Sequence, residues 1–307
     1  MDKIFQTFCN LYPHYKINTK FKKKIFYIFF SLFKPFIKGP IKLNFKDFFF
    51  YAYPQRKNYS RSLLKKAELH DEREINFFIK NIDDKSIFLD CGANQGFYTI
   101  PVAASNKNCK IIAFEPSNQE MKYLNQNISL NNIKNIETSY LGIGDKEGYF
   151  KFKNDNLEDN STKGGLIVED ENKNDGNKVI KVTTLDKFIN DRKNEIFSDT
   201  KLFIKIDLEG YDINAVYGSK NIIKNYFTVL LVEFSKMAVA SKVYSKSDFD
   251  KFLKENDLSI LDISGKQITL DSIHSMLHDL KGNHQVCGNF IIAKEKLLKN
   301  LKFNSYN

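Results

Sequence analysis

Cysteine is scarce in this chain, and its N-terminal part has no apolar run long enough to cross a membrane. The four cysteines lie far apart and in no metal-ligand spacing. They argue against a disulfide framework and suit a reducing compartment. The N-terminal apolar run, Ile25–Phe33, has nine residues, too few to span a bilayer as a helix. No secretory cleavage pattern accompanies it, so the sequence predicts a cytoplasmic protein.

Histidine is also sparse, with five residues in the whole chain. His274 and His278 are four apart on an expected helix, but they have no HExxH context and no evident further metal ligands. His284 precedes the last expected strand and is a candidate general base.

The net positive charge of the chain is confined to its N-terminal part. Residues 1–60 hold twelve Lys or Arg and two acids, a net charge of +10, whereas the remaining residues hold 35 of each sign. A neutral body has no electrostatic attraction for nucleic acid. With 42% hydrophobic residues the chain can bury a core. We therefore expect a basic extension over 1–60 and a folded domain over 61–307.

The extension contains a basic, aromatic stretch, FKKKIFYIFFSLFKPFIK at 21–38, which predicts a helix ended by Pro35, Gly39 and Pro40. Such a helix can pack its Phe face onto the body or onto a second subunit, which would make a homo-oligomer. It can also lie peripherally on an anionic inner-membrane surface. RNA binding is the weakest alternative, because no platform of base-stacking aromatics is evident.

Beyond residue 61, strand and helix patterns alternate, which predicts a parallel or mostly parallel sheet. The expected strands are 86–90, 110–114, 136–143, 201–207, 227–234, 258–263 and 289–293. The expected helices are 64–81, 98–105, 118–130, 213–225 and 247–256. A hairpin of 147–152 with 178–183 would enclose a long polar loop, 153–177, which with 264–285 is expected to bind the acceptor.

The segment IFLDCGANQGFYT at 87–99 is the most informative part of the chain. A strand ends at Asp90, and a turn with Gly92 and Gly96 leads into an expected helix. Glycine lets backbone approach a ligand closely. The next strand ends in Glu115, where a carboxylate would accept hydrogen bonds from both ribose hydroxyls. These features predict a site for a cofactor that contains a nucleoside.

The spacing D-x-G-x-N-x-G differs from the dinucleotide pattern G-x-G-x-x-G, because an acid replaces the first glycine. A carboxylate there repels a diphosphate and suits a cation. S-adenosylmethionine (SAM) fits, because it carries a sulfonium and an ammonium but no phosphate. The residues expected to contact SAM are Asp90, Gly92, Asn94, Gly96, Tyr98, Thr99, Glu115, Pro116, Gly142 and Ile143.

Within this set each group has an expected place. Asp90 would balance the ammonium or sulfonium, and the loop at 92–96 would lie under the amino-acid moiety. Tyr98 and Thr99 would receive the carboxylate at a helix start, and Gly142 with Ile143 would flank the adenine.

Lys205, Asp207 and Glu209 alternate at the end of one expected strand, so period two places them on one face. They are candidates to remove a proton from the acceptor and to orient it. Alternatively, Asp207 and Glu233 at neighbouring strand ends could hold a divalent metal, Mg or Mn, that acidifies the acceptor hydroxyl. In a third interpretation these charges only pair with one another.

Five ordered motifs resemble the FkbM family of SAM-dependent methyltransferases. They are DCGANQG at 90–96, AFEPS at 113–117, LGIGDKEG at 141–148, TLD at 184–186 and IKIDLEGYD at 204–212. One departure is Asp212, where the family usually has Glu. The resemblance covers about 71–295. It implies a Rossmann-like class I methyltransferase with a seven-stranded, mostly parallel sheet and helices on both faces.

The resemblance also implies an acceptor class, since relatives modify glycans and polyketides. We expect O-methylation of a sugar hydroxyl on a nucleotide-linked or lipid-linked precursor of a bacterial surface glycan, such as capsule or lipooligosaccharide. Methylation of a polyketide or other small natural product is the alternative enzyme activity. A SAM-fold scaffold or regulator whose extension binds a membrane or a partner is the alternative outside enzymes.

Overall fold

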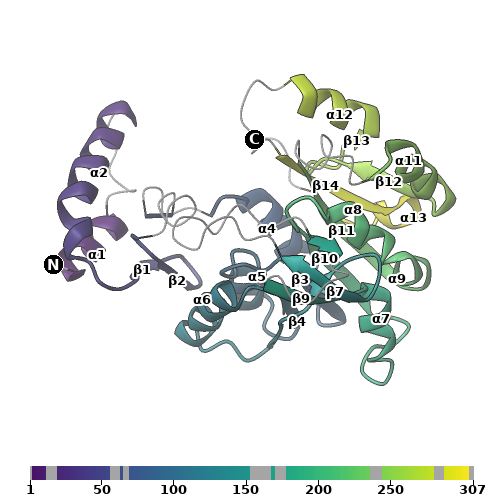
Figure 1. Cartoon of the computed structure of the whole chain (residues 1–307), viewed down its shortest axis with the longest axis horizontal. Helices are drawn as coiled ribbons and strands as arrows, with labels where there is room; N and C mark the ends of the chain where they lie inside the picture. Colours follow the sequence, from purple (N-terminus) through teal and green to yellow (C-terminus); the bar gives the residue numbers. More distant parts are fainter. Residues whose placement is uncertain are drawn as a thin grey trace.

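The fold places the N-terminal helices at one end of an α/β core whose sheet carries helices on both faces (Figure 1). The computed structural model describes residues 2–11, 19–55, 63–64, 69–152, 167–169, 178–235, 244–279 and 287–303. The expected boundary at residue 60 falls outside the described residues.

The main sheet has the strand order β13-β12-β14-β11-β10-β3-β4-β5. Its strands are β3 (Ser86–Cys91), β4 (Lys110–Phe114), β5 (Ile136–Ser139), β10 (Lys201–Ile206), β11 (Phe227–Ser235), β12 (Leu258–Leu261), β13 (Gln267–Ile268) and β14 (Cys287–Lys294). The neighbours from β11 to β5 pair in parallel, and β14 runs antiparallel to β11 and β12. The expected mostly parallel seven-stranded sheet is confirmed, with the two-residue β13 added at one edge.

Alternation along the central strands divides the core into two apolar layers. Leu202 and Ile204 of β10 face a cluster formed with α7 (Leu185–Asn190), α8 (Asp212–Tyr217), α9 (Lys220–Asn225), α11 (Lys246–Glu255) and α12 (Leu270–Asp279). Phe203 faces the other cluster, with α4 (Glu72–Asn81) and α5 (Thr99–Ser105). A short helix, α13 (Glu295–Leu298), follows β14. Both faces of the sheet are therefore buried, as parallel sheets require.

Two expected elements are divided in the structure. The expected strand 136–143 becomes β5 and the separate β6 (Gly142–Ile143). The expected helix 213–225 becomes α8 and α9 around Gly218, whose Cβ position would lie 2.0 Å from the Gly144 carbonyl oxygen. Backbone contact at that point leaves no room for a side chain. The expected helix 64–81 is described as a long helix only from Glu72 onward.

A second sheet has the order β6-β9-β7-β8. It contains β7 (Gly148–Phe152), β8 (Ile167–Glu169) and β9 (Lys178–Thr183). The antiparallel pairing of β7 with β9 confirms the expected hairpin. Apart from 167–169, the loop 153–177 lies outside the described residues.

The N-terminal extension forms two helices, α1 (Asp2–Leu11) and α2 (Thr19–Phe33), a 3-10 turn η2 (Lys34–Phe36), and a hairpin of β1 (Ile41–Asn44) with β2 (Phe49–Ala52). The α1 helix and the hairpin were not expected. Phe26 and Phe30 of α2 are buried in a cluster that reaches Ile100 of α5. None of the helices described in the chain is both long and apolar enough to cross a membrane.

The hairpin joins the body through amide side chains of α6 (Asn118–Leu130) and the residue that follows it. Asn127 Oδ1 accepts a hydrogen bond from Tyr51 N (2.8 Å), and Asn131 Oδ1 accepts one from Phe49 N (2.7 Å). Phe50 stacks on Phe97 with ring centroids 5.0 Å apart. The extension is therefore packed on the body, as one of the sequence interpretations required.

Candidate functional site

Four acidic residues mark the carboxyl ends of four adjacent parallel strands. Asp90 lies at the end of β3, Glu115 directly follows β4, Asp207 follows β10, and Glu233 lies near the end of β11. These strands are neighbours in the order β11-β10-β3-β4. Ligands of open α/β sheets bind at this edge, so the fold brings the sequence-predicted acids to one place.

Asp90 is a buried carboxylate held by the helix that follows it. Its side chain is 2% exposed, and Thr99 Oγ1 donates a hydrogen bond to Oδ2 at 2.5 Å. Burial raises the pKa of Asp90 to about 6, although bonds from the Thr99 hydroxyl and backbone N–H oppose the rise. Both donors of Thr99 serve this carboxylate, so any effect of Thr99 on a ligand passes through Asp90.

The two glycines of the loop are required by the protein's own packing. Gly92 has φ +86°, and a Cβ there would lie 1.9 Å from the Asp207 carbonyl oxygen. At Gly96, with φ +93°, a Cβ would lie 2.8 Å from Leu124 and 2.9 Å from Ile100. Both glycines were expected to open the turn for a ligand. At Gly92 the space is instead occupied by backbone at the exit of β10.

Glu115 closes the loop from the neighbouring strand. Its Oε2 accepts a hydrogen bond from Asn94 N (2.9 Å), and its Oε1 accepts one from Ser117 N (2.7 Å). Asn94 itself adopts a left-handed conformation, φ +50°. Pro116 stands between Glu115 and Ser117, whose side chain caps α6. One carboxylate oxygen is thereby held by the glycine loop and the other by the turn that leads into α6.

Tyr98 serves the structure in a way that the sequence did not indicate. Its hydroxyl donates to Asp71 Oδ2 at 2.8 Å, and its ring lies 4.8 Å from Lys205 Nζ. Tyr98 was expected to bind the carboxylate of SAM. Because its hydroxyl is already bonded to Asp71, the group that fits this contact is the Tyr98 backbone. Asp71 was not among the predicted site residues.

Lys205 and Asp207 form an ion pair at the centre of the site. Lys205 is 1% exposed, and its Nζ lies 2.9 Å from Asp207 Oδ2. Burial alone would lower the pKa of Lys205, but Asp207, Glu233 and Asp90 together raise it above the usual lysine value. A buried lysine with a raised pKa that is paired with Asp207 suits the orienting role of this pair better than the role of base.

Glu209 lies beyond the strand, so the period-two argument does not reach it. Its backbone is left-handed, with φ +53°, which is uncommon for a residue with a side chain and often accompanies function. Burial first, and then the charges of Asp207 and Asp212, raise the pKa of Glu209 above the usual carboxyl range. A carboxylate with a raised pKa is a stronger base, which suits proton removal.

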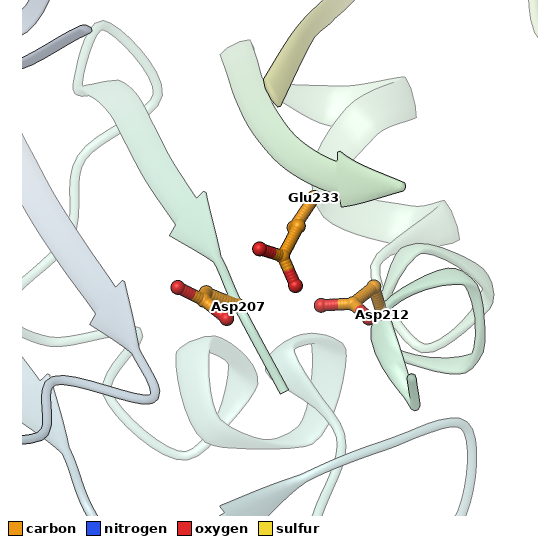
Figure 2. A group of neighbouring side chains, drawn as sticks. All are labelled: Asp207, Asp212 and Glu233. Carbon is orange, nitrogen blue, oxygen red and sulfur yellow. The ribbon is translucent and has the colours of Figure 1, made fainter. Parts of the chain in front are cut away.

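Asp212 joins Asp207 and Glu233 in a group of three carboxylates. One oxygen from each lies within 4.8 Å of the others, and Figure 2 shows the three side chains as neighbours, on β11, just after β10 and at the start of α8. Asp212 is 1% exposed and accepts bonds from Leu208 N (2.7 Å) and Gly210 N (2.9 Å). Burial and the Asp207 charge raise the pKa of Asp212. Three converging carboxylates are a ligand set suited to Mg²⁺ or Mn²⁺.

The remaining predicted residues are less closely tied to this group. Gly142 and Ile143 form β6 in the second sheet, and Ile143 is fully buried in the core. Both residues were expected to flank the adenine. Because the Ile143 side chain has no exposed face, only the Gly142 backbone fits that role. His284 lies outside the described residues. His274 Nε2 pairs with the Tyr244 hydroxyl at 2.8 Å, consistent with a packed histidine.

Comparison with known proteins decides the family. The family model described as methyltransferase FkbM domain matches residues 90–259, more than half of the chain. The chain belongs to the FkbM methyltransferase family. It is therefore a SAM-dependent methyltransferase. Among curated proteins, none matches the sequence.

Solved structures with a similar fold resemble this FkbM methyltransferase only distantly. An rRNA methylase from Streptococcus thermophilus has 12% identity and a TM-score of 0.40, covering 72% of this chain and 93% of its own. A putative rRNA-methylase from Clostridium thermocellum has 8% identity and a TM-score of 0.42, covering 73% and 94%. A putative methyltransferase from Streptococcus mutans in complex with SAH has 13% identity and a TM-score of 0.37, covering 72% and 95%. Likenesses this weak carry no argument about the acceptor.

The residues of the FkbM methyltransferase fit a SAM molecule. Buried Asp90 provides negative charge for a cationic ligand, which would favour its ionised form. Both oxygens of Glu115 are oriented by backbone N–H groups, and a carboxylate oxygen can accept more than one hydrogen bond. These two carboxylates lie at the ends of adjacent strands, which suits one ligand that has its cationic groups near Asp90 and its ribose near Glu115.

Asn127 supports the loop at residues 92–96, here called the SAM loop, and it was not among the predicted site residues. It is fully buried, and its Nδ2 donates to Gln95 O at 2.9 Å while its Oδ1 holds Tyr51 N. One side chain thus connects the SAM loop with the N-terminal hairpin. An Asn on an amphipathic helix carries no local signal of such a role.

Replacing Glu115 tests the ribose assignment. We expect Glu115→Ala to weaken binding of S-adenosylhomocysteine (SAH) by about 1–3 kcal/mol, because hydrogen bonds to a charged group are lost. Isothermal titration calorimetry measures the change. Glu195→Ala, which removes an exposed carboxylate paired with Lys110, is the matched control and should bind SAH normally. Unchanged affinity in Glu115→Ala would refute the assignment.

Proposed function

We propose that this FkbM methyltransferase methylates a hydroxyl of a sugar on a nucleotide-linked or lipid-linked precursor of a bacterial surface glycan. The observation that carries the proposal is the ion pair of buried Lys205 with Asp207, beside Glu209, at the sheet edge that holds the SAM loop. An alcohol must lose its proton during methyl transfer, so an O-methyltransferase needs a base at this position. An amine that is already deprotonated has no such need.

Each residue has a role in this proposal. Asp90 and Glu115, with the loop at Gly92, Asn94 and Gly96, hold SAM, which supplies a methyl group on a sulfonium sulfur. Backbone at Tyr98 and at Gly142, together with Pro116, completes that site.

On the acceptor side, Asp207 and Glu209 would orient the hydroxyl, and Glu209 would take its proton. Bound SAM would supply the methyl group to the hydroxyl oxygen and would leave as neutral SAH. Lys205 holds the Asp207 carboxylate in place through their ion pair.

A sugar acceptor is supported by the composition of two segments. The stretch 153–177 is rich in Asn, Asp, Glu, Lys and Gly, and 264–285 is also polar. Polar loops on a rigid scaffold suit a hydroxyl-rich acceptor better than a flat aromatic one. A polyketide or other small natural product is the alternative acceptor.

A divalent cation is the second candidate for activating the hydroxyl. Asp207, Asp212 and Glu233 provide converging carboxylate oxygens within 4.8 Å of one another. A bound Mg²⁺ or Mn²⁺ would lower the pKa of a coordinated hydroxyl, and it would compete with Lys205 for Asp207. Metal binding and proton removal by Glu209 therefore predict different responses to chelation.

Mass spectrometry tests the proposal. The purified enzyme is incubated with SAM and a panel of nucleotide-linked sugars, each with and without EDTA. We expect a gain of one methyl group on one sugar, unchanged by EDTA. Loss of the product with EDTA, restored by Mg²⁺, would favour the metal. Binding of SAH without any methylated sugar would contradict a nucleotide-linked acceptor and leave the lipid-linked glycan or a natural product.

A further inference from the structure

Helix α2 is apolar on two opposite sides. Phe26 and Phe30 are buried against the body, 0% and 4% exposed. On the opposite side Ile28, Leu32 and Phe36 are 54%, 63% and 57% exposed. Each of these three residues lies four positions after the one before it, so they form one continuous row over α2 and the adjoining 3-10 turn. We call this row the outer row. A helix that only packed on the body would need no apolar outer row.

Positively charged residues lie at both ends of the outer row. Lys24 is exposed and lies one helical turn before Ile28, and Lys38 is exposed just beyond Phe36. Residues 1–60 carry a net charge of +10 while the rest of the protein is neutral. A second copy of this surface would bring like charges together. An anionic surface with an apolar layer beneath it complements both the lysines and the outer row.

The outer row is held in a fixed position relative to the methyltransferase body. Phe26 and Phe30 on the inner side of α2 belong to the same cluster as Ile100 of α5. The following hairpin is bonded to Asn127 and Asn131. Figure 1 shows α2 at the end of the molecule away from α11 and α12. Whatever binds the outer row is therefore held at a set orientation to the SAM site.

We propose that the outer row, Ile28, Leu32 and Phe36, with Lys24 and Lys38 beside it, docks α2 flat on the surface of an anionic lipid bilayer. The apolar side chains enter the boundary between headgroups and acyl chains, and the lysines extend to the anionic headgroups. Bound in this way, the enzyme meets acceptors carried in the membrane. The docking itself does not depend on which hydroxyl is methylated.

Vesicle sedimentation with the full-length protein tests this proposal. One set of vesicles is phosphatidylcholine alone, and the other contains about one-third phosphatidylglycerol. Truncation of 1–60 is unsuitable, because it would expose the apolar residues that the extension covers. The apolar variant is the double substitution Ile28→Gln with Leu32→Gln, and its matched control is Phe197→Gln, which changes a residue 67% exposed outside the extension. The charge variant is Lys24→Glu with Lys38→Glu, and its control is Lys220→Glu with Lys299→Glu, both exposed.

We expect the wild type to bind anionic vesicles and to lose binding as salt rises. Each double variant should bind about tenfold or more weakly, while both controls bind as the wild type does. SAH affinity and melting temperature verify that every variant is folded. Equal binding by wild type and variants, or no preference for anionic vesicles, would overturn the proposal. So would wild-type dimerisation in sedimentation velocity, abolished by Ile28→Gln with Leu32→Gln, without vesicle binding.

Discussion

The Asp207→Asn enzyme should bind SAH as the wild type does and transfer methyl groups about 10²–10⁴-fold more slowly, the usual contribution of a positioned acid or base. Asp207 is the partner of buried Lys205 and lies in the group with Asp212 and Glu233. An amide keeps the shape but cannot hold an acceptor proton or fix the lysine charge. Steady-state kinetics and calorimetry on the same preparation measure the two effects.

Asp271→Asn is the control, because the Asp271 side chain is 82% exposed and its described ion pair, with Lys246, lies at the surface. It should leave turnover unchanged. Normal turnover in Asp207→Asn would remove this residue from the chemistry. Turnover that Mg²⁺ restores in part would assign Asp207 to a metal instead of to orienting the acceptor hydroxyl.

Lys205→Met should destabilise the protein by about 3–5 kcal/mol at neutral pH, because breaking a buried ion pair leaves uncompensated charge. Asp90, Asp207 and Glu233 all lose their shared cation. Chemical denaturation gives the free energy of unfolding. The control is Lys201→Met on the same strand, whose pair with Asp83 is 34% and 46% exposed and should cost about 0–1 kcal/mol.

The loss in Lys205→Met should also depend on pH. Burial already raises the pKa of Asp90 to about 6, and Lys205 opposes that rise. Without the lysine the pKa of Asp90 rises further. A carboxyl whose pKa is higher folded than unfolded costs stability as pH climbs from the unfolded value through the folded one. The difference from wild type should therefore be smaller at pH 5 than at pH 8. An equal loss at both values would contradict the electrostatic origin.

Local sequence patterns predicted several of the features on which methyl transfer in this protein depends. The strand ending in Asp90, the turn after it and the acid after the next strand are all local patterns, and they indicated SAM. Period two placed Lys205 and Asp207 on one side, and their ion pair confirms it. Alternating strand and helix signals predicted the sheet, because burial on both faces leaves a distinct apolar pattern.

The sequence by itself determined the family, the α/β sheet and the acids at its edge, since each rests on residues close together in the chain. Only the tertiary structure decided that Gly92 makes room for the Asp207 carbonyl, that Asp212 joins Asp207 and Glu233, and that Asn127 ties the SAM loop to the N-terminal hairpin. These contacts join segments far apart in sequence. Their partners are set by how helices and strands pack, and no local pattern records them.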